Sequence, residues 1–582
     1  MTEVAAIEWL IPLPVLLPFL GAAATMTLGR HPRLQRILSI IVLALGTAVA
    51  GALLVLADRN GITAVQVGGW PAPIGITLVS DRLSALMLVI AYVVLLAVMV
   101  YAVGQGIRDG DEHQPVSIFQ PTYLVMAAGI SNAFLAGDLF NLYVGFEVLL
   151  ASSFVLLTLG ASSDRVHAGV TYVMVSMLSS LVFLAGIAFT YAATGTLNLA
   201  QLAVRLSAVP EGVRIAIFAV FLVAFGIKAA VFPLSSWLPD SYPTAPAPIT
   251  AVFAGLLTKV GVYAIIRAQT LLFPGGSLDN VLLVAGLATM LFGIFGAIAQ
   301  TDVKRLFSFT LVSHIGYMIF GIGLSTRLGL AGAIYYVAHH IVVQTALFLV
   351  VGLIERQAGS ASLRRLGSLA AASPVLAALY LLPALNLGGI PPFSGFIGKV
   401  TLLEAGVEVG TPLAWVLVAG AVVTSLLTLY AVMRVWTKAF WRSRDDAPEG
   451  DMVAARPAVL LDDVGDVALA ERRDVGRMPT LMVGSTAALV LVGIVLTVVA
   501  GPLIGYTERA AGNLLDRSVY VGTVLGPQAA AELPEASGPA EHTGLSDASS
   551  SQPSTAGGPR SDAPSDPPGG HPRHGAPTED GR

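Results

Sequence analysis

Long apolar stretches separated by short polar loops fill most of the first 503 residues. A helix that crosses a membrane needs roughly 20 mostly apolar residues, and hydropathy predicts about fourteen such stretches. Their approximate centres are Leu16, Leu45, Val94, Ala127, Leu149, Leu178, Phe221, Leu256, Leu287, Ile315, Phe348, the stretch 376–407, Val422 and Leu489. The pattern therefore predicts an all-α polytopic membrane protein with about 14 transmembrane helices.

Composition supports the same class. The 582 residues are 55% hydrophobic and 12% charged, whereas a soluble protein carries about 25% charged residues. There is no cysteine, which excludes disulfides, iron–sulfur ligation and thiol catalysis. The first nine residues contain two glutamates and no basic residue, so they do not resemble a cleavable signal peptide, and the first helix is expected to remain.

Basic residues indicate an orientation. They gather in alternate loops, at Arg30, Arg33 and Arg36, at Lys304 and Arg305, at Arg356, Arg364 and Arg365, and at six arginines between 442 and 478. The other loops have scattered ones such as Arg59. Because basic loops stay in the cytoplasm, the pattern predicts a multi-pass plasma-membrane protein with both termini outside the cytoplasm.

Two of the predicted helices contain prolines near their middle. One carries Pro233 soon after Lys228, and the other carries Pro391 and Pro392 shortly before Lys399. Proline removes a helical hydrogen bond and clashes with the preceding turn, so both helices should be broken. Paired broken helices in two halves of a chain indicate an inverted-repeat transporter. The alternative is two independent proline kinks.

The predicted domain boundaries follow composition. Residues 1–503 form the fourteen-helix transmembrane domain, interrupted by a poorly ordered cytoplasmic insertion at about 442–478. Residues 504–582 are expected to form an extracytoplasmic, largely disordered tail, because from about Gly526 the chain has hardly any large apolar residue and cannot form a core.

Four charged residues lie inside the apolar stretches, at Glu147, Lys228, Lys259 and Lys399. A charge at the bilayer centre costs roughly 2.5–3.5 kcal/mol on insertion scales, so such residues indicate function. Glu147 and Lys228 are predicted to pair, because opposite charges keep each other ionised. The alternatives are that Glu147 reaches the interface or bonds to a neighbouring helix, that Lys228 reaches Ser235 and Ser236, and that Lys399 is a lone gate.

Three histidines, His314, His339 and His340, lie between the lysines of the two halves. Histidine titrates near neutral pH, so lysines and histidines together suggest a proton relay, with Glu404 as a candidate exit. Each histidine alone could instead stabilise helix packing. No metal site, cofactor site, nucleic-acid site or ATP-binding loop is predicted, which favours a secondary transporter subunit over an enzyme.

Several segments resemble the proton-translocating antiporter-like family, which includes the large membrane-arm subunits of respiratory complex I and subunits of Mrp-type cation/proton antiporters. The matching segments are 225–240, 245–250, 255–263, 302–308, 314–316 and 389–399. Segments 69–76, 141–147 and 339–343 are most similar to the D-type branch of the Mrp antiporter subunits.

The resemblance implies a fourteen-helix fold with inverted repeats, in a complex with sibling subunits that exchanges Na⁺ or another monovalent cation for protons. It implies that Glu147 and Lys228 pair, that Lys259 connects the halves and that Lys399 ends the relay. The sequence departs from the family at Ser235, Tyr242 and Gln344, where titratable residues are common. A proton-pumping subunit of complex I or of a membrane-bound hydrogenase remains an alternative, as does a structural scaffold subunit.

Overall fold

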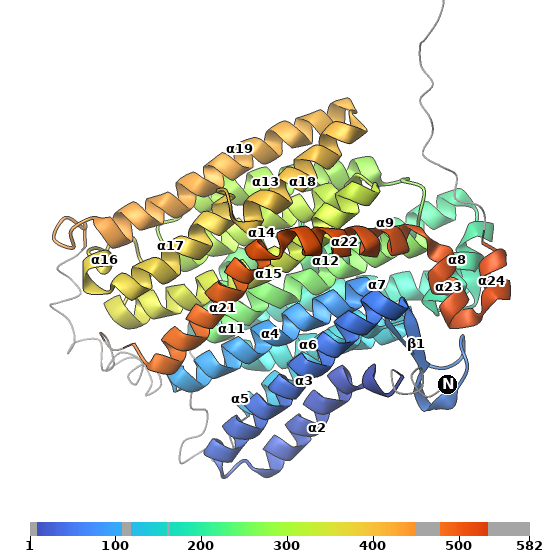
Figure 1. Ribbon diagram of the computed structural model, residues 1–582, viewed down its shortest axis with the longest axis horizontal. Helices are drawn as coiled ribbons and strands as arrows, with labels where there is room; N and C mark the ends of the chain where they lie inside the picture. Colours follow the sequence, from blue (N-terminus) through green and yellow to red (C-terminus); the bar gives the residue numbers. More distant parts are fainter. Residues whose placement is uncertain (1–7, 107–117, 160–162, 450–475, 477, 534–582) are drawn as a thin grey trace, which may run out of the picture. The chain divides into compact units, whose positions relative to one another are not determined.

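A computed structural model describes residues 8–106, 118–159, 163–449, 476 and 478–533, and these residues are mostly helical (Figure 1). Within these ranges, twelve helices are long and apolar enough to cross a membrane. The two remaining predicted spans correspond to the 17-residue helix α5 (Phe119–Leu135) and to the pair α17 (Pro374–Gly388) and α18 (Ser394–Val409). The all-α polytopic fold is confirmed.

The other helices have the following bounds: α2 Leu13–Thr27, α3 Pro32–Asn60, α4 Arg82–Gln105, α6 Leu139–Thr158, α7 Ser163–Thr194, α8 Leu199–Arg205, α9 Glu211–Ala229, α10 Trp237–Ser241, α11 Ala247–Val252, α12 Thr258–Arg267, α13 Asp279–Ala299, α14 Val303–Gly323, α15 Arg327–Ala358, α16 Leu369–Ala372, α19 Pro412–Val435, α21 Thr480–Val498, α22 Ala500–Leu515, α23 Arg517–Leu525 and α24 Pro527–Ala531. Strands β1 (Thr63–Gln66) and β2 (Thr77–Ser80) form an antiparallel hairpin with Thr63 opposite Ser80. Short 3₁₀ turns and the π-helical segments η4 (Phe253–Leu257), η5 (Ala268–Leu272) and η6 (Trp436–Trp441) complete the order.

Two successive segments repeat one order of elements. The series α5, α6, α7, α8, α9 and α11–α12 is followed by α13, α14, α15, α16, α17–α18 and α19. Matching single bridges, Asp138 to Asn198 and Asp302 to Ser362, join corresponding points of the two segments. Each segment crosses the membrane an odd number of times, so the second starts on the opposite side. The two repeats are therefore inverted.

Both predicted breaks are present. Helix α9 ends at Ala229, and Ala230 takes a left-handed conformation with φ 57°, which is strained for a residue with a Cβ. Pro233 then lies in the turn before α10. Helix α17 ends at Gly388, its C-cap Gly389 has φ 80°, and Pro391 and Pro392 precede α18. The helices are thus interrupted beside Lys228 and before Lys399.

The C-terminal prediction is wrong for residues 504–533, which are largely helical. Helix α22 leads from α21 toward α23 and α24 (Figure 1) and buries Tyr506, Ala510 and Leu514. Arg509 pairs with Asp58 of α3 at 2.8 Å. Because α22 is apolar on one face only, its average hydropathy conceals it. Residues 534–582 lie outside the described residues.

The insertion predicted at 442–478 is described from 442 to 449 and at 476 and 478. Arg442 donates hydrogen bonds to the carbonyls of Leu363 and Leu366. Glu449 pairs with Arg364 and Arg365 at 2.8 and 3.1 Å. Residues 442–449 are therefore attached to the loop after α15, and the prediction of poor order is wrong for them.

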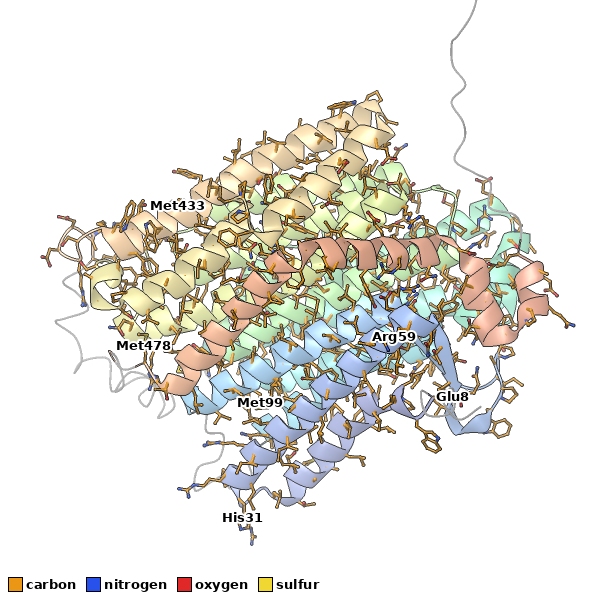
Figure 2. All side chains as sticks on the ribbon, in the orientation of Figure 1. Glu8, His31, Arg59, Met99, Met433 and Met478 are labelled. Carbon is orange, nitrogen blue, oxygen red and sulfur yellow. The ribbon has the colours of Figure 1, made fainter. Side chains whose placement is uncertain are left out.

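The ends of the helices alternate as the arginine pattern requires. Figure 2 shows His31 and Met478, which lie beside arginine-rich loops, toward one end of the bundle, and Glu8 and Arg59 toward the other. The side that faces the cytoplasm stays a prediction.

Candidate functional site

The break between α17 and α18 surrounds the amino group of Lys399. Its Nζ donates to the carbonyls of Leu387 and Gly388 at 3.0 and 3.1 Å and to the hydroxyl of Ser425 at 3.0 Å. The side chain is buried, and Nζ lies 5.4 Å from the ring centre of Tyr317. A protonated lysine has three N–H donors, and each finds an acceptor here.

The broken helix explains this arrangement. The last carbonyls of a helix have no partner within it, and the C-terminal end carries partial negative charge that attracts a cation. Leu387 and Gly388 supply the last carbonyls of α17, and Lys399 reaches them from the next helix. The break therefore creates a binding place for an ammonium group, and Ser425 of α19 is a contributor that the sequence analysis missed.

The three histidines lie together behind this break. His314 and His340 have ring centres 5.1 Å apart, and His339 points to α18, where its Nδ1 is 2.9 Å from Ser394 Oγ. His314 Nε2, His339 Nε2 and both ring nitrogens of His340 are buried without a hydrogen-bond partner among the described residues. The two adjacent histidines thus face different helices, as their helical spacing predicts.

Tyr336 of α15 connects the histidines to one another. Its hydroxyl is 2.7 Å from His314 Nδ1, and its ring centre lies 5.4 Å from that of His339. It also lies 5.4 Å from Tyr317, the ring beside Lys399. A phenol hydroxyl both donates and accepts, so Tyr336 can take part in a hydrogen-bonded chain. Its position in the sequence gave no signal, because tyrosine at helical spacing is common in any core.

Lys259 lies on α12 and is completely buried. Its Nζ donates to the carbonyl of Ala254 at 2.7 Å, within the π-helical segment η4. Such segments are frequent at functional sites because they disturb the regular hydrogen-bond ladder. Gly255 lies in the same segment, and a Cβ there would be 2.2 Å from Thr345 Oγ1 of α15. The lysine-bearing helix therefore packs very closely against the histidine-bearing helix.

The predicted ion pair between Glu147 and Lys228 is not formed. Lys228 Nζ instead lies 3.4 Å from the carbonyl of Ser176 and 3.3 Å from Ser180 Oγ, both on α7, and 5.6 Å from the ring centre of Phe146. Glu147 Oε1 is buried without a partner in the described structure. The acceptors of Lys228 are also not Ser235 and Ser236. Each of the two charged groups therefore keeps unused hydrogen-bonding capacity.

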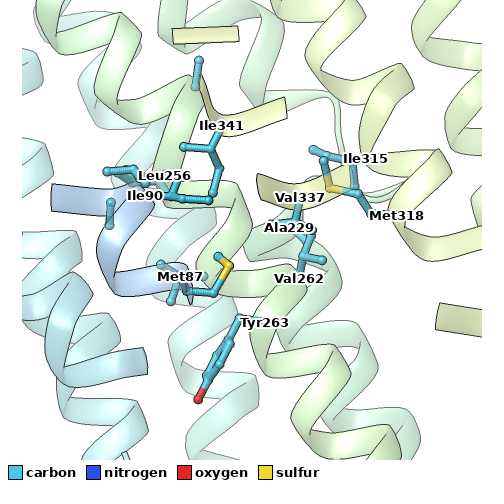
Figure 3. Close-up of a cluster of buried hydrophobic side chains, with 14 of the residues drawn as sticks. Met87, Ile90, Ala229, Leu256, Val262, Tyr263, Ile315, Met318, Val337 and Ile341 are labelled. Atoms are coloured by element: carbon cyan, nitrogen blue, oxygen red, sulfur yellow. The ribbon is translucent and has the colours of Figure 1, made fainter. Parts of the chain in front are cut away.

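Apolar side chains surround these polar groups. Figure 3 shows Ala229, Ile315 and Ile341, which directly follow Lys228, His314 and His340 in the chain, within one cluster with Leu256 and Val262. All five side chains are buried. An apolar surrounding has a low dielectric and strengthens electrostatic interactions.

The three positions at which the sequence departs from the family resemblance all have buried polar side chains. Gln344 Nε2 donates to the carbonyl of Phe307 at 2.8 Å, while Gln344 Oε1, Ser235 Oγ and the Tyr242 hydroxyl are buried and unpartnered in the described part of the chain. An unpaired buried polar atom costs about 1–3 kcal/mol. These atoms are therefore places where water would be stabilised.

Arg267 is a buried charge that the sequence analysis missed. It pairs with Asp81, the N-cap of α4, at 2.5 Å, and both side chains are less than a tenth exposed. Its Nε donates to the hydroxyl of Tyr263 at 3.0 Å, and Tyr520 of α23 lies over the guanidinium. Asp81 opens α4 and is buried by its neighbours. The signal for Arg267 was an arginine inside the apolar run Ala247–Leu272.

Asp138 is the N-cap of α6, and its Oδ1 accepts from the backbone N–H of Asn141 at 2.6 Å. Burial raises the pKa of Asp138 to about 6, although hydrogen bonds from the backbone of Asn141 and Phe140 oppose this. Oδ2 is buried and unpartnered among the described residues. The folded protein therefore keeps this carboxyl group protonated at a higher pH than the unfolded chain does.

This pKa predicts a pH-dependent effect of Asp138→Asn. Because the pKa is raised in the folded state, wild-type stability falls as pH rises from about 4 to 6 and stays lower above that. Asparagine is an equally good N-cap and does not ionise. The variant is expected to have a higher melting temperature than wild type at pH 8, with the difference shrinking at pH 4.5, measured by thermal unfolding in detergent. An equal difference at both pH values would contradict the assignment.

The remaining candidates lie at the rim. Glu404 is exposed on α18, one turn beyond Lys399, so its role as an exit stays a prediction. Lys304 pairs with Glu355 at 2.7 Å, and Arg305 pairs with the exposed Asp240 at 2.9 Å. These pairs connect helix ends and are not part of the buried set.

Comparison with known proteins places this arrangement in a family. The model of the NADH:quinone oxidoreductase/Mrp antiporter transmembrane family matches residues 136–428, which include all of the buried lysines and histidines described above. The chain belongs to this family. It is 38% identical over 526 residues to the D subunit of the Na(+)/H(+) antiporter of Alkalihalophilus pseudofirmus, covering 89% of this chain and 99% of that protein.

Solved structures of related proteins support the same family assignment. A chain of the Mrp complex from Dietzia sp. DQ12-45-1b matches with a TM-score of 0.80 and 32% identity, over 90% of this chain and 100% of the other. A chain of respiratory complex I from Thermus thermophilus matches with a TM-score of 0.70 and 25% identity, over 87% of this chain and 99% of the other. This member of the family is thus a multi-span membrane protein whose structural relatives are subunits of large complexes.

Proposed function

We propose that this chain is the proton-translocating subunit of a multi-subunit Na⁺/H⁺ antiporter. Protons move along Glu147, Lys228, Lys259, His314, His340, His339 and Lys399. The observation that carries the proposal is the cage of Lys399, where a broken helix, a hydroxyl and a tyrosine ring surround an ammonium group next to a cluster of histidines. The similar protein of Alkalihalophilus pseudofirmus is named as a subunit of a Na(+)/H(+) antiporter, which supports Na⁺ and H⁺ as the exchanged ions.

The relay works by local exchange of protons between neighbours. Lysine and histidine can both lose and regain a proton, unlike arginine. Partly unsatisfied donors at Lys228 and Lys259 and unpartnered ring nitrogens at the histidines give places where a proton or a water can bind. Coupling to the cation then requires that Glu147 alternately approaches and leaves Lys228, because the pair favours the charged form of the lysine.

The proposal includes an assembly and an orientation. The chain lies in the plasma membrane among sibling subunits, with the arginine-rich loops in the cytoplasm and both termini outside. The second candidate is a proton-pumping subunit of complex I, favoured by the match to the Thermus thermophilus chain. In that case proton movement would follow electron transfer rather than a sodium gradient.

The test is transport by the intact complex in vesicles. Glu147→Gln and Lys228→Ala are each expected to reduce sodium-dependent proton movement by about 10²-fold, the range of a lost proton-transfer group, while the subunits still copurify. Lys438→Ala, outside the buried set, serves as the matched control and should transport normally. Normal transport by both variants would support a scaffold role, and proton movement driven by NADH instead of sodium would support the complex I alternative.

A further inference from the structure

The hydrogen bonds at the second helix break place two polar groups, Asn386 and Ser394, in series beside His339. The backbone N–H of Gly395 donates to Asn386 at 2.8 Å, and a backbone N–H can only donate. The accepting atom of Asn386 is therefore its oxygen, Oδ1, which fixes the orientation of the amide. Asn386 is 3% exposed, so solvent does not compete for this atom.

The same oxygen is an acceptor for the hydroxyl of Ser394. Ser394 Oγ lies 3.3 Å from Asn386 Oδ1, and in this pair only the hydroxyl can donate, because an amide oxygen accepts. The Ser394 hydroxyl has one hydrogen. With that hydrogen directed to Asn386 Oδ1, the serine oxygen is left as an acceptor toward His339 Nδ1, which lies 2.9 Å away, and the imidazole then carries a hydrogen on Nδ1.

We propose that Asn386 and Ser394 lock His339 in the tautomer with its proton on Nδ1, so that His339 exchanges relay protons through Nε2 alone. This inference rests on the proposed relay. A proton that arrives at Nε2 gives an imidazolium, and the same Nε2–H bond breaks when the proton leaves. The hydrogen bond from Nδ1–H to Ser394 is present in both the neutral and the protonated form of His339, so none of these hydrogen bonds has to reverse its direction.

The surroundings of Nε2 agree with this role. Nε2 is buried and has no partner in the part of the chain that the structure describes. Gly395 packs beside it, and a Cβ at that position would be 3.0 Å from Nε2 and Cε1. Glycine therefore leaves the atom uncovered. Partners of the second ring nitrogen generally set which nitrogen of a histidine reacts, and Asn386 and Ser394 are positioning residues in that sense.

The neighbouring His340 has the opposite arrangement. Both of its ring nitrogens are buried without a described partner, so no protein group selects a tautomer. It can accept a proton on one nitrogen and release one from the other. The two adjacent histidines therefore have different roles. His340 passes protons from one ring nitrogen to the other side of its ring, and His339 receives and releases them at Nε2 beside the break.

The test is nitrogen-15 NMR of the intact complex containing this chain, with its histidines labelled, at a pH where His339 is neutral. One histidine signal that disappears in His339→Gln should show a protonated Nδ1 and an unprotonated Nε2. Ser394→Ala should abolish that pattern, and Ser394→Thr, which keeps the hydroxyl, should restore it. Asn386→Leu should mix the tautomers.

Thr497→Val is the matched control. Thr497 Oγ1 accepts from the backbone N–H of Ser394 at 3.0 Å and is not part of the chain of hydrogen bonds that ends at His339, so this variant should keep the Nδ1-protonated signal. An Nε2-protonated His339 in the wild type, or an unchanged signal in Ser394→Ala, would overturn the proposal. Because the spectrum needs no transport, a wild type with the expected tautomer but no sodium-dependent proton movement would overturn the proposed function instead.

Discussion

Replacing Lys399 with alanine is expected to stop sodium-dependent proton movement, with a loss of about 10²-fold or more. The amino group of Lys399 is held by two helix-end carbonyls and a serine hydroxyl, and alanine leaves those acceptors without a donor. Lys399→Arg is expected to lose transport as well, because arginine stays protonated in proteins and cannot release the proton. The measurement is the rate of pH change in vesicles after sodium is added.

The arginine variant separates two roles of this lysine. A lysine that only holds a positive charge at the break would tolerate arginine, whereas a lysine that releases a proton would not. Space is limited, since a Cβ on Gly389 would lie 2.9 Å from Lys399 Cδ, so copurification of the subunits has to be verified for each variant. Normal transport by an assembled Lys399→Arg complex would show that no proton leaves this residue.

Breaking the ion pair between Asp81 and Arg267 is expected to destabilise the protein more than any other single charge removal at the edge of the bundle. Removing one partner of a buried pair costs about 3–5 kcal/mol, because the other charge stays buried without compensation. Arg267→Met should therefore lower the melting temperature strongly. Combining it with Asp81→Asn should recover part of the loss, because the double variant leaves no buried charge.

The exposed pair between Arg509 and Asp58 provides the control. Arg509 is 46% exposed in its side chain, and pairs of this kind contribute about 0–1 kcal/mol. Arg509→Ala should therefore shift the melting temperature of the detergent-solubilised complex only slightly. If Arg267→Met and Arg509→Ala had equal effects, the buried pair would not hold the ends of α4 and α12 together.

Local patterns predicted the architecture well. Spans and breaks depend on residues that are close in the chain, since hydropathy and proline act over a few turns. The same reasoning failed for α22, where apolar residues occupy one face and the average is low. It also failed for Arg267. An arginine inside an apolar run indicates a buried charge, but its role can be assigned only when its partner, Asp81, is known.

The sequence by itself determined most of the residues that carry charge or titrate inside the apolar spans, namely Glu147, Lys228, Lys259, Lys399 and the three histidines but not Arg267, and that two helices break near them. The tertiary structure alone decided their partners. Lys228 binds α7 rather than Glu147, and His339 meets Ser394, which lies 55 residues further along the chain. The physical reason is that the cost of a buried charge follows from the local sequence, while the acceptors that offset the cost come from helices brought together by folding.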